Sequence, residues 1–185
     1  MNKTDIYGKN PLYRAAERGK LETVRLLIAL GAEPFLTKAA HMGQKATAEM
    51  LLLAGVNPNM ADSDGNTALL CAAWMDHYDV VQLLLQRGAN PNKGNHHGQT
   101  PLYLAAKMGL KNIVIQLIEG GADLNKTDLW GKTPLLGAVR SNKKALVKLL
   151  MDNGADQNIA EDNGTTPLSH ARMNGYLDII NILTD

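Results

Sequence analysis

The chain has 185 residues, of which 45% are apolar and 20% charged, and its formal net charge is +1. These proportions are those of a folded globular chain and exclude a disordered one, while the near-zero charge provides no overall attraction to nucleic acid or to an anionic membrane. The single cysteine, Cys71, excludes an internal disulfide. Because the first twenty residues resemble no secretory signal and no apolar run is long enough to span a bilayer, we expect a soluble, intracellular protein of the cytoplasm.

A glycine followed by alanine or valine recurs along the chain and marks an internal repeat. A second marker, threonine followed by proline or alanine and then leucine, recurs with a period of 33 residues. The glycines of the first marker are Gly31, Gly55, Gly88, Gly121 and Gly154. The threonines of the second marker are Thr67, Thr100, Thr133 and Thr166. Because two independent markers stay in phase, we expect about six copies of one structural unit.

The chemistry of one copy predicts two helices followed by a hairpin. Thr100 and Pro101 suit the start of a helix, because the hydroxyl can cap free N–H groups and proline fits the first helical position. Gly109 can end that helix in the left-handed conformation, and Asp76 or Asn142 takes this place in two other copies. Apolar residues at helical spacing predict the second helix, and the turn residues after it predict a two-stranded hairpin.

The copies are expected to cover residues 5–35, 36–61, 62–94, 95–127, 128–160 and 161–185. The second copy is nine residues shorter than the period, and it lacks the residues of the hairpin tip and of the first helix start. We therefore predict a gap in the row of hairpins between the first and third copies. Two interpretations stay open: a neutral deletion, which a solenoid tolerates, or a notch that receives a partner.

The copies share the order Thr-Pro-Leu, Ala-Ala, Gly, Leu-Leu and Gly-Ala, which with the 33-residue period resembles the ankyrin repeat over about residues 5–185. The resemblance implies an all-α fold with short β-hairpin loops, an ankyrin repeat solenoid of about six helix-turn-helix repeats in one domain over residues 1–185. The histidine that usually follows Thr-Pro-Leu in this family is absent from every copy. Small ankyrin proteins include adaptors and scaffolds of eukaryotes. Others resemble secreted effectors of bacteria that live inside host cells, and these act in the host cytoplasm.

The sequence contains no motif for catalysis or for a cofactor: it has no phosphate-binding glycine loop, no nucleophile elbow and no zinc-protease motif. Cys71 stands beside two alanines in a predicted helix, which is typical of a buried structural thiol. His96 and His97 are adjacent at a predicted hairpin tip, where neighbouring side chains diverge, so no metal site is expected there. The sequence therefore predicts a protein that is not an enzyme and needs no cofactor or metal.

The ankyrin resemblance implies a protein or peptide partner, because domains of this family bind partners in a concave groove lined by hairpin tips and first helices. The two tryptophans, Trp74 and Trp130, fall on predicted groove positions where the fold requires no aromatic residue, and aromatic residues dominate binding energy at interfaces. The alternative is that both indoles pack on neighbouring repeats. Met75, Met108 and Met173 are expected to share one column of the groove. We expect a monomer whose partner contacts are Tyr7, Arg18, Trp74, Met75, His96, His97, Lys107, Met108, Trp130, Arg140 and Arg172.

Basic residues concentrate around the fifth copy, where residues 126–148 contain six of them against a single acid, Asp128. Such a cluster suits an alternative function, an anion-binding module for a phosphoinositide or a nucleic acid. The other interpretation is a solvated basic edge, because the rest of the chain brings the net charge close to zero, which argues against nucleic acid as a partner. The alternative anion-binding residues are Lys126, Lys132, Lys143, Lys144 and Lys148.

Overall fold

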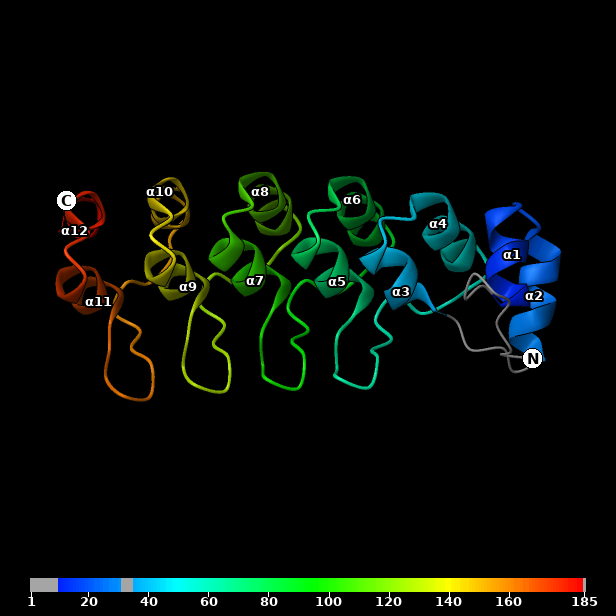
Figure 1. Cartoon of the computed structure of the whole chain (residues 1–185), viewed down its shortest axis with the longest axis horizontal. Coiled ribbons are helices and arrows are strands. Elements are labelled where there is room, and N and C mark those ends of the chain that lie inside the picture. Colours follow the sequence, from blue (N-terminus) through cyan, green and yellow to red (C-terminus); the bar gives the residue numbers. More distant parts are fainter. Residues whose placement is uncertain (1–9, 31–34, 185) are drawn as a thin grey trace.

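The computed structural model of the chain describes residues 10–30 and 35–184. These residues form helices that follow one another as pairs along a row (Figure 1). In this part of the chain the one β-type pairing is an isolated bridge between Ala61 and Thr67, and no helix is long and apolar enough to cross a membrane. The helices are α1 (Pro11–Glu17), α2 (Leu21–Ala29), α3 (Leu36–His41), α4 (Lys45–Leu53), α5 (Ala68–Trp74), α6 (Tyr78–Gln86), α7 (Pro101–Met108), α8 (Lys111–Glu119), α9 (Pro134–Arg140), α10 (Lys144–Asp152), α11 (Pro167–Met173) and α12 (Leu177–Thr184).

The first helix of most pairs starts at a capping side chain. In α5, α7, α9 and α11 a threonine hydroxyl accepts a hydrogen bond from the backbone N–H three residues later, at 3.1–3.2 Å, and the Asn10 amide oxygen does the same for α1 at 2.8 Å. The shortest helix, α3, follows Phe35 and has no side-chain cap. The second copy, which is shorter than the period, therefore also lacks a side-chain helix cap.

The first helices of the later pairs also end where the sequence predicts. Gly109 closes α7 with a φ of 91°. Asp76 and Asn142 take the same left-handed conformation after α5 and α9, with φ of 60° and 52°. Because their short polar side chains tolerate this region better than other non-glycine residues do, they replace glycine at this point of the repeat, as predicted.

Two rows of helices make up the body of the molecule. The inner row consists of α3, α5, α7, α9 and α11, each packed on the next. The outer helices α4, α6, α8, α10 and α12 lie on the side of this row that faces away from the hairpin loops, above it in Figure 1. Alanines such as Ala72 and Ala105 are fully buried in the inner row, so neighbouring backbones approach closely. Leu84 and Leu117 are fully buried at the same register of two outer helices. One continuous apolar core therefore runs along the row, which confirms the predicted all-α stack.

Four hairpin loops project from the same side of the row, before α5, α7, α9 and α11 (Figure 1). Side chains tie each loop to the next: Asn59 Oδ1 accepts a hydrogen bond from the backbone N–H of Asn90 at 2.7 Å, and the same bond recurs one repeat later. The loop tips are joined as well, because the Leu129 N–H donates to the His97 carbonyl at 3.0 Å. The loops therefore form a braced row in which neighbouring tips hold fixed positions.

The first pair of helices does not continue this row. Helix α1 packs on α2 and on the outer helix α4, and the Tyr13 ring stacks on Phe35 with 5.5 Å between the ring centroids. Figure 1 shows α1 and α2 across the end of the row, in an orientation different from that of the later pairs. Residues 30–35 separate α2 from α3, whereas residues 54–67 separate α4 from α5, which agrees with the shorter second copy. Residues 31–34 lie outside the described residues, so the gap in the row of hairpins stays a prediction. Stacking in register holds from α3 onward, and the repeat boundaries remain predictions.

Candidate partner-binding groove

Two clefts open between neighbouring hairpin loops on the side of the inner helices. The first, the Trp74 cleft, has a volume of about 470 Å³, and the second, the Arg140 cleft, about 260 Å³. The residues that line the Trp74 cleft are Asp64, Asn66, Leu70, Trp74, Asn95, His96, His97, Gln99 and Leu104. The residues that line the Arg140 cleft are Trp130, Lys132, Arg140, Glu161, Asp162 and Asn163.

The two clefts occupy the same place in different repeats. All six residues of the Arg140 cleft have their equivalents in the Trp74 cleft, two repeat lengths earlier in the chain. Because the two clefts lie at the same positions of the repeat, the difference between them comes from the side chains. The equivalent pairs are Asp64 and Trp130, Asn66 and Lys132, Trp74 and Arg140, Asn95 and Glu161, His96 and Asp162, and His97 and Asn163.

The Trp74 cleft combines an exposed indole with an apolar wall. Trp74 is the last residue of α5 and is 46% exposed, so its ring is not part of the core. Leu70 and Leu104 line the same cleft. Of the chain's two tryptophans, this one has no aromatic or cation–π contact in the described residues. Its exposed face is therefore free for contact with another molecule.

Amide groups and one carboxylate form the polar part of the Trp74 cleft. Asn95 Nδ2 donates hydrogen bonds to Asn66 Oδ1 at 3.3 Å and to Gln99 Oε1 at 3.4 Å. Asp64 is exposed, and it is the one carboxylate that lines the cleft. Within the described part of the chain its side chain takes part in no ion pair and accepts no hydrogen bond, although its backbone N–H donates to Asp62. The carboxylate is thus unused by the fold.

In the Arg140 cleft the carboxylate and the aromatic ring contact other side chains of the same chain. One terminal nitrogen of Arg140 donates to both carboxylate oxygens of Glu161, at 2.8 and 2.7 Å, and only 5% of the Glu161 side chain is exposed. The Lys132 Nζ lies over the Trp130 ring, 5.0 Å from its centroid. The ring of His97 stacks on the same indole with 5.6 Å between centroids. The acid and the aromatic ring of this cleft therefore already have basic or aromatic neighbours.

The charges of the Arg140 cleft also act on two neighbouring titratable groups. Burial, and next the charge of Asp128, raise the pKa of Tyr103. Burial, and next the charge of Arg140, lower the pKa of His170. Both groups are therefore held in their neutral forms at neutral pH.

The adjacent histidines in the loop before α7 diverge, as the sequence predicts. The ring of His96 lies against Gly65 in the preceding loop, whereas the ring of His97 stacks on Trp130 in the following loop. The two imidazoles therefore contact different neighbouring loops. Among the described residues there is no group of three or more histidine, cysteine, aspartate or glutamate side chains that could hold a metal ion.

The methionine column of the groove consists of Met42, Met75 and Met108. Each of them directly precedes the residue that closes its helix in the left-handed conformation, and each is 41–53% exposed. The expectation that Met173 shares this column is wrong, because one further residue separates it from the closing glycine of α11. Counting back from the closing glycines would have found Met42 in the sequence.

Arg172 does not hold the same position in its helix as the groove residues Trp74 and Arg140. Those residues are the seventh after their capping threonine, whereas Arg172 is the sixth after Thr166. The equivalent sixth residue of α9, Val139, is fully buried. Since α11 is the last inner helix of the row, Arg172 is instead exposed at its end. The predicted contact Lys107 keeps the register of Trp74 and Arg140 and is exposed on α7.

Two further predicted contacts do not join the clefts. Tyr7 lies outside the described residues. Arg18 follows α1, the helix that packs on α4 instead of on the inner row. The groove that the structure describes therefore belongs to the later repeats.

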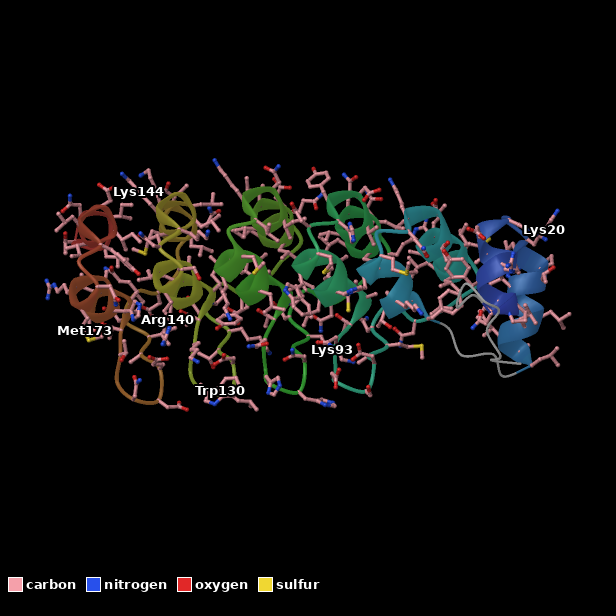
Figure 2. The ribbon with its side chains drawn as sticks, viewed as in Figure 1. Lys20, Lys93, Trp130, Arg140, Lys144 and Met173 are labelled. Carbon is pink, nitrogen blue, oxygen red and sulfur yellow. The ribbon has the colours of Figure 1, made fainter. Side chains whose placement is uncertain are left out.

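The basic residues of the fifth copy do not form one patch. Figure 2 shows Lys144 on the side of the outer helices and Trp130, with its neighbour Lys132, among the loops. Lys144 pairs with Asp178 at 3.0 Å, and Lys148 lies 3.6 Å from Asp152. The fold therefore brings two carboxylates from outside the basic stretch, Asp152 of α10 and Asp178 of α12, to its lysines. Lys126 is exposed, and the Lys143 side chain lies against Gly109.

Cys71 is buried in α5, as predicted for a structural thiol. Burial, and next the charge of Asp62, raise the pKa of Cys71 to about 11. The thiol therefore stays protonated at neutral pH and is a poor nucleophile.

The sequence of the chain is similar to known proteins. A family model described as three copies of the ankyrin repeat matches residues 36–128 and 102–185, and a model of the single ankyrin repeat matches residues 7–38. A transient receptor potential cation channel subfamily A member 1 homolog from Caenorhabditis elegans is 35% identical over 82 residues. This stretch is 40% of the chain but 7% of the relative, so the likeness concerns a small part of that protein.

Proposed function

Because the chain belongs to the ankyrin repeat family, whose repeats are generally protein–protein interaction modules, we propose that it is an adaptor or scaffold that binds a partner protein without catalysis. The partner segment lies in the groove between the hairpin loops and the inner helices of the later repeats. The observation that carries this proposal is the half-exposed Trp74 in a cleft of about 470 Å³. Tryptophan is among the residues that contribute most to binding at interfaces.

The bracing of the loops supports the same proposal. Hydrogen bonds such as that from Asn90 N–H to Asn59 Oδ1 hold neighbouring loops at fixed positions before any partner binds. A groove that is already ordered loses little conformational entropy on binding, and this loss is one of the main costs of association. The exposed methionines Met42, Met75 and Met108 add an adaptable apolar border along the inner helices.

Affinity capture from a cell lysate with Trp74→Ala tests the proposal, in parallel with the double variant Trp74→Ala/Trp130→Ala. Met173→Ala is a matched control, because Met173 holds the register of Trp74 at the end of the row and is 69% exposed. We expect a captured protein that is retained by the control and lost by both tryptophan variants, with the far-ultraviolet circular dichroism unchanged. Capture that does not depend on Trp74 would contradict the groove as the binding site.

The proposal includes an intracellular monomer that binds no nucleic acid. The near-zero net charge argues against nucleic acid as a partner. The ion pairs of Lys144 and Lys148 argue against it as well, because carboxylates interrupt the basic surface of the fifth copy. A salt titration of the captured complex separates this reading from anion binding by the fifth copy, because phosphate-driven binding weakens steeply with salt. Light scattering measures the oligomeric state, and imaging of the tagged protein in its cells measures the location.

A further inference from the structure

We infer that the Trp74 cleft binds a basic side chain of the partner, that of an arginine. The inference rests on the proposed function, because it names the chemistry of the partner in the same groove. It follows from a comparison of the two equivalent clefts and from the charge of the Trp74 cleft.

The Arg140 cleft shows what this place in the repeat does when it is filled. The Nζ of Lys132 lies 5.0 Å from the centroid of the Trp130 ring. A guanidinium nitrogen of Arg140 lies 2.7 Å from a carboxylate oxygen of Glu161. An aromatic ring and a carboxylate in this place are therefore each matched by a cation. The chain itself supplies both cations in this cleft.

The Trp74 cleft has the ring and the carboxylate without the cations. At the positions of Lys132 and Arg140 it has Asn66 and Trp74, and no lysine or arginine lines it. The carboxylate is that of Asp64, which has no ion pair in the described residues. Asp64 is the one acidic side chain of the lining, and no lysine or arginine of the lining opposes it. A cation from outside the chain is the complement of this lining.

An arginine fits the cleft better than other basic groups do. Its planar guanidinium can stack on the Trp74 indole while it donates N–H groups in its own plane to the Asp64 carboxylate. The oxygens of Asn66 and Gln99 each accept one hydrogen bond from Asn95, so each keeps an acceptor site for a further donor. The apolar stem of the side chain can pack on Leu70 and Leu104 at the same time.

Selection from a library of random linear peptides tests the inference with the full chain. Binders to the protein are sorted by whether Trp74→Ala abolishes their binding, and we expect the dependent group to be enriched in arginine. In one such peptide the arginine is then replaced by citrulline, which keeps the shape and removes the charge. We expect Asp64→Asn to weaken the arginine peptide about fivefold, as for an exposed charge pair, and to leave the citrulline peptide unchanged.

Asp162→Asn is the matched control, because Asp162 is an exposed carboxylate of the Arg140 cleft and the change in net charge is the same. Trp74-dependent peptides without a basic residue, enrichment in acidic residues, or equal weakening by Asp64→Asn and Asp162→Asn would each overturn the inference and leave the proposed function standing. A library with no Trp74-dependent binder would overturn the proposed function itself.

Discussion

The Trp74 cleft and the Arg140 cleft differ in side chains and not in position. Both lie between neighbouring hairpin loops, and their lining residues are two repeat lengths apart. In the Arg140 cleft, Arg140 and Lys132 satisfy an acid and an aromatic ring, so the repeats are joined there by internal contacts. In the Trp74 cleft the described residues provide no equivalent contacts, and no lysine or arginine lines it. The same place in the repeat is thus occupied by internal contacts in one cleft, and in the other it is the site that we propose for a partner.

The largest expected effect concerns the helix that lies between the two clefts. Leu102 is fully buried in α7, which packs on both α5 and α9. We expect Leu102→Ala to lower the free energy of unfolding by about 3 kcal/mol, because it leaves a cavity in the core, and to disturb both clefts. Urea denaturation measures the effect, with the exposed Leu177→Ala as the control. Equal effects of the two substitutions would show that the row does not share one core.

The two tryptophans provide the next test. We expect Trp74→Ala to reduce the binding free energy of a groove-dependent peptide by about 2 kcal/mol. For Trp130→Ala we expect a loss of less than about 1 kcal/mol, because His97 and Lys132 already occupy part of its ring surface. Isothermal titration calorimetry measures both values. Equal losses would remove the distinction between an open and a filled cleft.

Neutralising Glu161 and Asp64 in turn compares how much each carboxylate contributes to the free energy of unfolding. Glu161→Gln breaks a pair whose acid is buried and whose base is partly exposed, so we expect about 1–2 kcal/mol of destabilisation. Asp64→Asn removes a charge that the fold does not use, and we expect a change within about 0.5 kcal/mol. Thermal and urea unfolding measure both. A larger effect of Asp64→Asn would show that its carboxylate has a structural role.

A further test fills the open cleft with a side chain of the protein itself. Asn66→Lys places a lysine at the position of Lys132, next to the Asp64 carboxylate. We expect binding of the arginine peptide to weaken about fivefold, because the new ammonium competes for the same site. Gln82→Lys, on the exposed face of α6, changes the net charge equally. Similar weakening by both substitutions would point to general repulsion instead of competition.

Much of the architecture could be predicted from local chemistry. Thr100 and its equivalents cap their helices as expected, since a hydroxyl reaches the N–H three residues later whatever the surroundings. Asp76 and Asn142 close helices in place of glycine for a similarly local reason. The buried Cys71 followed from its place beside two alanines. The error on Arg172 and Met173 was one of register, and the capping Thr166 was already present in the sequence to correct it.

Contacts between repeats could not be predicted in the same way. The pair of Arg140 and Glu161 joins residues from different copies, and the stack of His97 on Trp130 depends on how two loop tips are held together. The orientation of α1 and α2 depends on which neighbour buries their apolar faces next to the shortened second copy. The repeating pattern of caps, alanines and turns specified the row of helices, because each of these signals acts within a few residues. Packing between copies decided which exposed side chains are already paired and which remain free, because these contacts join groups that are distant in the chain.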